Sequence, residues 1–390
     1  MNKEKSLSIA IMSVFALIMG GTVVTPALQS LAEAFPETPF SSILLVQTLP
    51  SLFLIPSTII AGSIAGTKVK YKTLVIVGII LFVVAGAAPF FATSFFQILI
   101  SRAIFGIGVG IISPLASALI INLFDGQIRA NKLGAGNAFM MIGGIILQLL
   151  GGFLCSHHWR YTFLAHLLAV IPLVIVIFLL FEPPNIVQQE KTKAKLPIAV
   201  YVYSLIFGVS CILINTLPLN MSSIIISEKL GSPTSVGMVL SLFTIGGMVA
   251  GAFFGGIYKI ANRFTVSIGM FVAAVGLGIG FYGNNLIMLT IACACAGMAF
   301  TILLPAVTTE VGNIVTPSCV GIATGMIMAA MNFGVFVAPY YISFVGKIFN
   351  PQENIIRFPI FVSMIILAVS GVIYALARLR NPPELSEIKS

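Results

Sequence analysis

Long hydrophobic stretches alternate along the whole chain with short polar breaks. Each stretch is close to the roughly 20 residues that an α-helix, rising about 1.5 Å per residue, needs to cross about 30 Å of hydrocarbon. The breaks carry turn-forming and charged residues, such as Asp125-Gly126-Gln127 and Gly283-Asn284-Asn285. The pattern therefore predicts an all-α polytopic membrane protein with twelve transmembrane helices, at residues 7–28, 42–65, 73–92, 96–123, 133–154, 161–181, 197–220, 235–257, 264–282, 286–312, 320–345 and 358–377.

Composition supports the same class of protein. The chain of 390 residues is 58% hydrophobic and 8% charged, with a mean hydropathy of +1.11, which a water-soluble fold of this length does not show. The sequence has no phosphate-binding loop, no His-Glu metal cluster and no nucleophile elbow, and its five cysteines lack metal-binding spacing. We therefore expect no enzyme activity, no metal and no cofactor.

Basic residues are distributed unevenly between the two sides that the twelve spans define. With the N-terminus in the cytoplasm, fifteen Lys and Arg residues fall on the cytoplasmic side, four on the outer side, and one within the membrane. Lys and Arg near span ends favour the cytoplasmic side, so both termini of this multi-pass protein of the cell membrane are predicted to be cytoplasmic. The net charge of +9 follows from this topology. Anionic headgroups of the lipid bilayer attract this basic side, and no nucleic-acid partner is needed to explain the charge.

The second half of the chain repeats the first. Glycine, proline and asparagine residues recur at a separation of 191 residues, in the pairs Gly106 and Gly297, Pro114 and Pro305, Asn122 and Asn313, Gly134 and Gly325, and Gly143 and Gly334. This spacing predicts two parallel six-helix bundles around a central cavity, at residues 1–183 and 197–390, joined by a cytoplasmic linker at 184–196. Parallel repeats place a substrate site near the membrane midplane, and rocking of the halves exposes that site to each side in turn.

Arg102 is the one charge well inside a predicted span, in the stretch Ile98 to Gly110. An arginine at the centre of a membrane helix costs roughly 2.5 to 3.5 kcal/mol on insertion scales, so it needs a partner or a wet cavity. Eight residues separate Arg102 from Ser94 at the outer edge, which places it about 12 Å deep. Arg102 is therefore predicted either to brace neighbouring helices or to act on a proton or solute in a polar interior.

Two segments carry recognisable spacing. The loop after the second span, Gly62 to Lys72, has the spacing Gly-x-x-Ala followed by a basic tail, with Gly66 where an acidic residue would complete the pattern. The fourth span matches a second pattern at five positions, Ile98, Arg102, Phe105, Gly106 and Gly108. In register on twelve spans, these segments resemble the signatures of the major facilitator superfamily, and the likeness covers essentially the whole chain.

The likeness is greatest to the drug and proton antiporters, the multidrug efflux branch of that superfamily. The fifth span matches the antiporter pattern at Gly143, Gly151 and Gly152, with Leu147-Gln148 in place of its central Gly-Pro. In those antiporters the arginine of the fourth span is implicated in proton coupling. The resemblance therefore implies a similar role for Arg102.

Acidic residues are rare in the predicted spans. Of the eleven Asp and Glu residues, Glu310 alone falls within a span, near its inner end, and Asp125 lies at the edge of another. Proton-driven transporters usually carry a buried carboxylate that loads and releases a proton. Coupling is therefore predicted to involve Arg102 with Glu310, Asp125 or a histidine, unless the protein is a uniporter. His166, in the sixth span, is expected to be a hydrogen-bonded packing residue.

Further residues complete the predicted site. Polar and large side chains at a depth compatible with Arg102 are expected to bind solute together with it: Gln47, Asn137, Met141, Gln148, Asn215, Asn332 and Phe336. The signature loop and glycines that allow close helix packing are expected to act in gating: Gly62, Lys68, Lys70, Gly106, Gly110, Gly143 and Gly255.

These observations together predict a secondary active transporter that moves a small amphipathic or drug-like solute by alternating access, with export coupled to protons. One alternative is an uptake permease for a small organic anion bound by Arg102. An alternative of a different class is a non-transporting membrane sensor or a lipid-handling protein. We expect a monomer whose partners are the solute, the bilayer and, in the coupled case, protons.

Overall fold

The structure, a computed structural model, describes residues 3–182, 196–316, 319–349 and 356–380. Within these ranges the chain forms α-helices and short 3-10 helices and no strand. The first half comprises α1 (Lys3–Phe15), η1 (Gly20–Ala27), α2 (Leu28–Ala34), α3 (Phe40–Ile64), α4 (Tyr71–Ala87), η2 (Ala88–Phe91), α5 (Phe95–Leu123), α6 (Gly126–Cys155), η3 (Trp159–Ala169) and α7 (Val170–Leu179). The second half comprises α8 (Ile198–Ser227), α9 (Pro233–Ala261), η4 (Asn262–Phe264), α10 (Thr265–Tyr282), α11 (Leu286–Gly312), α12 (Val320–Phe349) and α13 (Phe358–Arg380).

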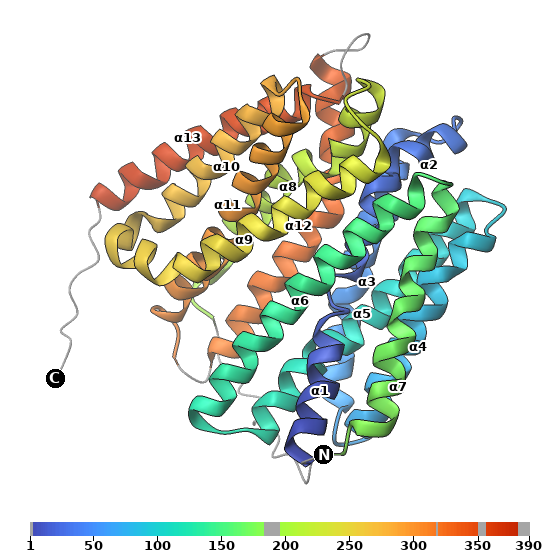
Figure 1. Cartoon of the computed structure of the whole chain (residues 1–390). Coiled ribbons are helices and arrows are strands. Elements are labelled where there is room, and N and C mark those ends of the chain that lie inside the picture. The colour runs from blue at the N-terminus through green and yellow to red at the C-terminus, as the bar shows by residue number, and fades with distance from the viewer. Residues whose placement is uncertain (1–2, 183–195, 317–318, 350–355, 381–390) are drawn as a thin grey trace.

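Twelve membrane spans follow from these elements, as predicted. Eleven continuous helical stretches are long and apolar enough to cross a bilayer, and one of them, Pro233–Tyr282, has 50 residues. Fifty residues of helix would extend about 75 Å, more than twice the hydrocarbon thickness. Asn262, with a positive φ of 44°, ends α9 and lets α10 turn back. Figure 1 shows these two helices joined at the edge of the molecule.

The first span is broken where the sequence predicts one helix over 7–28. α1 ends at Phe15, and the chain continues as the 3-10 helix η1 and then α2. Gly20-Gly21 disfavours an α-helix, and Pro26 has no N–H to donate. Gly20 also lies so close to the Phe82 ring that a Cβ atom would collide with it. The sixth span likewise begins as a 3-10 helix, η3, before α7.

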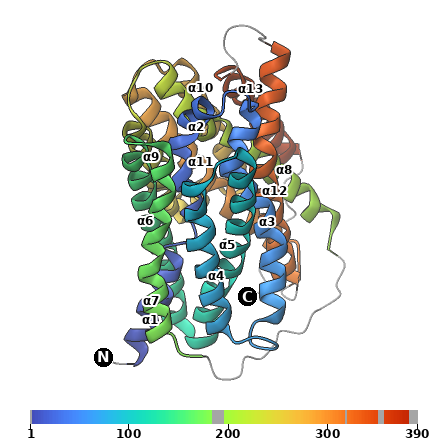
Figure 2. The same cartoon turned by 90° about the vertical axis from the view of Figure 1, so that its right-hand side faces the viewer.

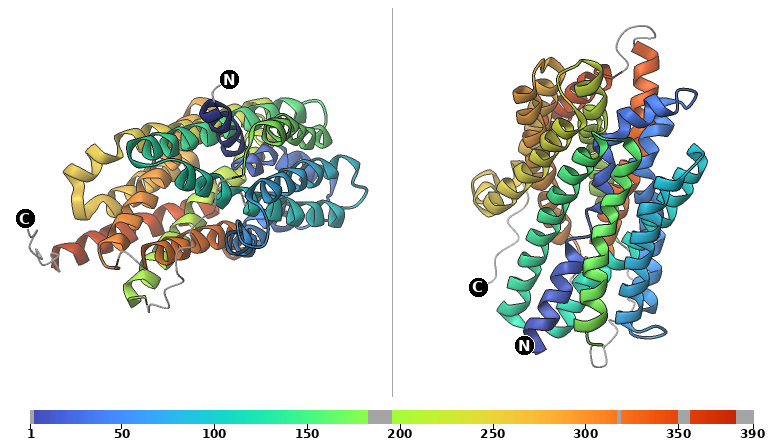
Figure 3. Two further views of the ribbon diagram at one scale, coloured as in Figure 1. Left: turned by 90° about the horizontal axis from the view of Figure 1, so that it is seen from below. Right: turned by 45° about the vertical axis from the view of Figure 1, so that its right-hand side comes forward.

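Each half has a buried core of its own. One cluster of buried hydrophobic residues lies wholly between residues 10 and 180, and a second lies wholly between residues 200 and 367. In Figure 2 the first-half helices α4, α5 and α7 run side by side. Figure 3 shows the blue-to-green and the yellow-to-red helices gathered on two sides. The exact half boundaries and the linker stay predictions, since residues 184–195 lie outside the described ranges.

Close helix contacts recur in both halves, as the 191-residue repeat predicts. A Cβ atom on Gly106 of α5 would collide with the carbonyl oxygen of Pro50 on α3. A Cβ atom on Gly297 of α11 would collide in the same way with Phe243 on α9. Because only glycine lets two backbones approach this closely, the duplicated glycines fix equivalent helix pairs in the two halves.

The two halves meet through α6 with α9 and α3 with α12. The end of the molecule where α1 begins and α13 ends carries Lys68, Lys70 and Arg129, and we call it the basic face. We call the other end of the helices the opposite face. A third buried cluster combines residues of both halves, including Val23, Leu147, Leu219 and Ala338. It lies toward the opposite face.

Candidate functional site

Arg102 is held inside the first half by α3 and by its own helix. A capping box between Ser94 and Gln97 starts α5 two turns earlier. The side chain of Arg102 is completely buried. Its Nε atom donates to the carbonyl oxygen of Val46 at 2.9 Å, and the guanidinium carbon lies 4.2 Å from the centre of the Phe105 ring. The guanidinium therefore points into the bundle and away from the acyl chains.

Most of that guanidinium lacks a hydrogen-bond partner. Its two terminal nitrogens, Nη1 and Nη2, are buried and donate to no protein group. A buried donor left unsatisfied costs about 1 to 3 kcal/mol, and more when it is charged. A desolvated cation over an aromatic face regains about 2 kcal/mol, so the Phe105 ring offsets a part of this cost only. Free donors of this kind can bind a water molecule or an acceptor group of a solute.

His166 of η3 lies beside the same aromatic rings. The side chain is completely buried, and its ring centre is 5.5 Å from that of Phe82 and 5.0 Å from that of Phe105. Nδ1 is 2.9 Å from the carbonyl oxygen of Phe163, as expected for a packing histidine. Nε2 is buried without a partner, which the sequence did not indicate.

Gln47 and Gln148 are the predicted solute-binding residues with unpartnered groups. The side-chain oxygen Oε1 of each is buried and accepts no hydrogen bond. Gln47 directly follows Val46, whose carbonyl oxygen accepts from the guanidinium described above. Gln148 lies where α6 meets α9, its backbone oxygen 2.8 Å from the position that a Cβ atom on Gly237 would take. Both amides are available to a water molecule or a solute.

The remaining predicted solute-binding residues are not linked to Arg102 by any described hydrogen bond. Asn215 and Asn332 each donate to a carbonyl oxygen one turn earlier in the same helix, that of Cys211 at 2.8 Å and that of Met328 at 2.9 Å. Three others are partly or fully exposed: Asn137, Met141 and Phe336. Their assignment to one solute site stays a prediction. In the described part of the chain no three His, Cys, Asp or Glu side chains are grouped to hold a metal ion.

Glu310, the predicted coupling carboxylate, is held in an ion pair at the basic face of the second half. Arg378 of α13 donates to the Glu310 carboxylate and to the hydroxyl oxygens of Tyr203 and Tyr374. The side chains of the ion pair are 15% and 18% exposed. This cluster ties α8, α11 and α13 together, and it is separate from Arg102 in the first half.

Three more predicted residues lie on the basic face. Asp125 pairs with Arg129 one turn later at 2.7 Å, and its side chain is 97% exposed. Lys68 and Lys70, predicted to act in gating, are exposed. Exposed pairs of this kind contribute about 0 to 1 kcal/mol, so the Asp125 pair is a minor contribution to the fold.

The glycines predicted to act in gating fall into two groups. A Cβ atom on Gly106, Gly110 or Gly143 would collide with the backbone of a neighbouring span. A Cβ atom on Gly62 or Gly255, near the basic face, would meet nothing within 4 Å. The helices of the first half are therefore in close backbone contact at the first three glycines, whereas Gly62 and Gly255 have open space beside them.

Contacts between the halves lie toward the opposite face. The Ser222 hydroxyl of α8 donates to the carbonyl oxygen of Pro26 at 2.8 Å, and the Gln29 backbone N–H donates to the Ser222 oxygen at 3.2 Å. A Cβ atom on Gly152 of α6 would lie 2.7 Å from the carbonyl oxygen of Pro233 on α9. Among the described residues no hydrogen bond or ion pair joins the two halves at the basic face.

Comparison with protein families explains this arrangement. The model of the Major Facilitator Superfamily matches residues 10–213 and 203–390, which together span nearly the whole chain. The chain belongs to the Major Facilitator Superfamily. It is therefore a multi-pass membrane transporter and not an enzyme, as its sequence predicts.

Relatives within the superfamily include drug-resistance proteins. The quinolone resistance protein NorA of Staphylococcus aureus is 23% identical over 401 residues, which cover 98% of this chain and 99% of NorA. The multidrug transporter protein MdtP of Bacillus subtilis is 28% identical over 176 residues, and the match spans 43% of this chain and 30% of MdtP. The likeness to NorA thus extends over both halves.

Solved transporters share the fold. A bacterial homologue of the human lysosomal transporter Spinster, in an inward-facing and unoccupied conformation, superposes with a TM-score of 0.75 at 16% identity, over 96% of this chain and 97% of that protein. The D-xylose–proton symporter also gives a TM-score of 0.75, at 15% identity over 96% and 97% of the two chains.

The superfamily's signature loop has an unexpected partner in this chain. Gly66, at the acidic position, takes a positive φ of 72° and turns the loop between α3 and α4. The Glu182 carboxylate accepts from the backbone N–H groups of Tyr71 at 2.7 Å and of Lys72 at 3.0 Å. An acid at a helix N-terminus satisfies otherwise unpaired N–H groups. The sequence gives no signal for this contact, because Glu182 lies more than 100 residues along the chain.

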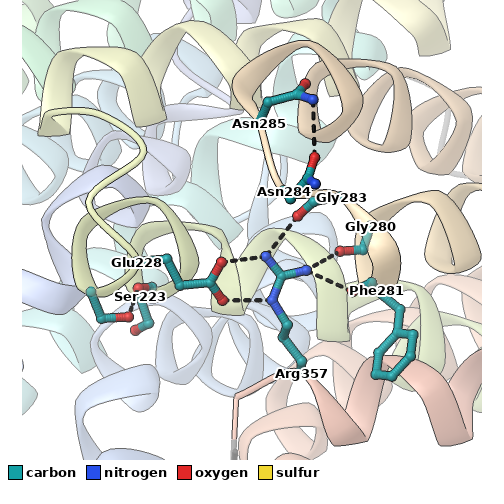
Figure 4. A network of polar contacts seen from close by, with 9 residues as sticks. Ser223, Glu228, Gly280, Phe281, Gly283, Asn284, Asn285 and Arg357 are labelled. Atoms are coloured by element: carbon teal, nitrogen blue, oxygen red, sulfur yellow. Dashed lines mark hydrogen bonds and ion pairs between the residues drawn. The ribbon is translucent and has the colours of Figure 1, made fainter.

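A second buried arginine of this transporter is fully satisfied. Arg357, just before α13, donates from Nε and Nη2 to the two carboxylate oxygens of Glu228 at 2.5 Å each (Figure 4). It also donates to the carbonyl oxygens of Gly280, Phe281 and Gly283, at 2.7 to 2.9 Å. These three carbonyls close the C-terminal end of α10. Arg357 therefore ties α8, α10 and α13 together at the opposite face.

Proposed function

We propose that this transporter exports small amphipathic compounds across the cell membrane in exchange for protons, by alternating access. Its basic face lies in the cytoplasm in this proposal, because Lys and Arg near span ends favour that side. Both termini are then cytoplasmic. Residues 1–183 and 197–390 act as the two moving halves of a monomer.

The placement of contacts between the halves supports alternating access. The described hydrogen bonds between the halves lie toward the opposite face, at Ser222, Pro26 and Gln29. None of the described ones lies at the basic face, where a Cβ atom on Gly62 or Gly255 would meet no neighbour. In a rocking mechanism this corresponds to a conformation closed to the outside.

The unpartnered guanidinium of Arg102 is the observation that carries the proposal of proton coupling. A fully buried arginine with two free terminal nitrogens is poorly suited to bracing helices, since a brace uses its donors. Intramembrane charges of this kind mark proton or substrate pathways. Glu310 and Asp125, the other two predicted coupling residues, each already have an arginine partner, so we place the coupling at Arg102 instead.

Relatives support the substrate class. NorA is named for resistance to quinolones and MdtP as a multidrug transporter. We extend this class of small, partly apolar compounds to the present chain. The proposed solute-binding residues combine amide and apolar groups in keeping with such compounds: Gln47, Asn137, Met141, Gln148, Asn215, Asn332 and Phe336, with Arg102.

Flux into proteoliposomes tests this function. A quinolone is loaded outside vesicles that contain the purified protein, and either a pH gradient or a voltage is imposed. Proton exchange predicts that the pH gradient drives quinolone movement in the absence of voltage, in vesicles with protein and not in empty ones. Flux that ignores the pH gradient would contradict proton coupling, and absence of any protein-dependent flux would contradict transport of this substrate class.

Uptake of a small organic anion is the second candidate. The two free terminal nitrogens of Arg102 form the fork that binds a carboxylate with two hydrogen bonds. An Arg102→Lys change separates the candidates, because a lysine keeps the charge but not the fork. Anion binding predicts severe loss of carboxylate uptake in this variant, whereas coupled export predicts that part of the quinolone flux survives.

A further inference from the structure

His166 is the buried titratable residue that the proposed coupling leaves unused. It lies on η3, completely buried, with its ring against Phe82 and Phe105 and so close to Gly86 that a Cβ atom there would lie 2.5 Å from the ring. Nδ1 is 2.9 Å from the carbonyl oxygen of Phe163. Because a carbonyl can only accept, Nδ1 carries the hydrogen, and Nε2 of the neutral ring is an acceptor.

Arg102 offers donors that complement this acceptor. Nε2 of His166 and both terminal nitrogens of Arg102 are buried and without protein partners. Both side chains contact the same Phe105 ring, the guanidinium carbon at 4.2 Å and the imidazole centre at 5.0 Å from the ring centre. One water molecule that accepts from Arg102 and donates to Nε2 would satisfy atoms of both residues.

The other groups around His166 are uncharged. The ring faces Phe82 and Gly86 from α4, the Gly20 carbonyl from η1, and Phe105 from α5. Burial and the charge of Arg102 both favour the neutral ring in this arrangement. The acidic residues described in the first half are all exposed: Glu4, Glu33, Glu37, Asp125 and Glu182. A carboxylate is therefore not available to carry a proton next to Arg102 in this structure.

We propose that His166 carries the transported proton, that its Nε2 atom takes up this proton in an arrangement in which the ring lies farther from Arg102, and that a water molecule bridges the neutral Nε2 to Arg102 in the present arrangement. This inference rests on the proposed function. A hydronium ion from bulk water gives its proton to Nε2, so that an N–H bond forms, an O–H bond breaks and a water molecule is left. The protonated ring then donates from both nitrogens, Nδ1 to Phe163 and Nε2 to the water or to the Gly20 carbonyl.

Protonation of His166 changes the balance between conformations. Two cations against one Phe105 ring repel each other, and the repulsion is strong where water is excluded. Proton binding therefore favours an arrangement in which the guanidinium and the imidazole lie farther apart. Arg102 is bonded to α3 through Val46, and His166 sits on η3, so the change is transmitted to two different spans of the first half.

Two variants remove the proton-binding imidazole, and each keeps a polar atom near the position of one of its two ring nitrogens. In His166→Asn the side-chain N–H₂ can replace the Nδ1 hydrogen bond to Phe163. In His166→Gln the amide reaches the position of Nε2. Neither amide takes up a proton in the working pH range. If one variant fails to fold in detergent, the other still provides the test. His157→Gln changes an exposed histidine in the loop after α6 and is the matched control.

Quinolone movement in proteoliposomes provides two readouts. A pH gradient of one unit can support about a tenfold accumulation for one proton per solute, since 1.4 kcal/mol corresponds to a factor of ten. We expect the variants to lose this accumulation completely, while exchange of labelled for unlabelled quinolone at equal pH continues near the wild-type rate. A packing role would lower both readouts together and would overturn the proposal.

The outcomes for wild type separate the inference from the proposed function. Wild type that shows no accumulation under a pH gradient contradicts proton-coupled export itself. Coupled wild type together with coupled His166→Asn or His166→Gln contradicts only the role of the histidine. Loss of coupling in His157→Gln as well would show that the effect is not specific to the buried site, and would also overturn the inference.

Discussion

Arg102 and Arg357 are both buried, one in each half of the transporter, and they differ in how their guanidinium groups are satisfied. Arg357 makes five hydrogen bonds, two to the Glu228 carboxylate and three to the carbonyls that end α10. Arg102 makes one, to Val46, and leaves both terminal nitrogens without a partner. The side chain of each is nearly or fully inaccessible.

This difference in hydrogen bonding suggests a structural role for Arg357 and a functional role for Arg102. A buried arginine whose donors are all satisfied holds its helices in one arrangement, and its removal is destabilising because several acceptors lose their donor at once. A buried charge with free donors adds little to stability and can bind a water molecule or an acceptor group of a solute. Stability and transport should therefore respond in opposite ways to substitutions at the two arginines.

The largest expected effect on stability is that of Arg357→Ala. It leaves the last carbonyls of α10 and the partly exposed Glu228 carboxylate without their donor, which should cost more unfolding free energy than the roughly 1.5 to 3 kcal/mol of a single charged hydrogen bond. Thermal unfolding in detergent measures this. Arg160→Ala is the matched control, because Arg160 at the opposite face of the first half makes one described hydrogen bond, to Ala92 at 3.0 Å, and its loss should cost about 1 kcal/mol. Equal losses in the two variants would contradict this account of Arg357.

Glu310→Gln should have an intermediate effect on stability. It weakens the charged hydrogen bond to Arg378, which should cost about 1.5 to 3 kcal/mol, while quinolone flux driven by a pH gradient persists. Unfolding in detergent and flux in proteoliposomes are measured on the same preparation. Unchanged stability together with abolished coupling would show that Glu310 is the coupling carboxylate, and that proton coupling is not confined to the first half.

Arg102→Ala should change stability less than Arg357→Ala and Glu310→Gln. The substitution removes one hydrogen bond and also the unfavourable burial of a poorly paired charge, so the unfolding free energy should change by no more than about 1 kcal/mol. The same thermal unfolding experiment tests it beside Arg357→Ala. A loss as large as that of Arg357→Ala would show that Arg102 is a brace.

A small shift between conformations is expected from Gly237→Ala, at the contact between α6 and α9. The new Cβ atom would lie 2.8 Å from the Gln148 carbonyl oxygen and weaken the closed opposite face. A bias of about 1 kcal/mol would change the open population about fivefold. Cys155, buried near this face, should then react faster with a membrane-impermeant maleimide when the other four cysteines are alanine.

Gly256→Ala on the same helix is the control for that shift, since its Cβ atom would meet no neighbour within 4 Å. Labelling of Cys155 should stay at the parental rate in this variant. Faster labelling in both variants would mean that alanine substitution in α9 acts in general, and not through the contact between the halves.

Hydrophobic length and repeated glycines made most of the fold predictable. Twelve spans follow from apolar stretches long enough to cross a bilayer, and the duplicated contacts of Gly106 and Gly297 follow from their 191-residue spacing. Hydropathy is the same for a 3-10 helix and an α-helix. The breaks in the first and sixth spans, set partly by contact of Gly20 with Phe82, were therefore not predictable.

The site was predictable only in part, because pairing depends on contacts between distant residues. A charge inside an apolar span identified Arg102 as a candidate. The sequence could not show that Glu310 is tied to Arg378, or that Glu228 and Arg357, 129 residues apart, form an ion pair. It also gave no sign that His166 has one satisfied and one free nitrogen, since that depends on the path of η3.

The most direct test of the central claim is quinolone flux driven by an imposed pH gradient in proteoliposomes that contain equal amounts of folded wild type or Arg102→Ala. A proton-transfer role predicts a loss of at least about a hundredfold in the variant, with unfolding temperature nearly unchanged. Wild-type flux in Arg102→Ala, or a loss that matches the loss of folded protein, would contradict the claim that Arg102 serves transport.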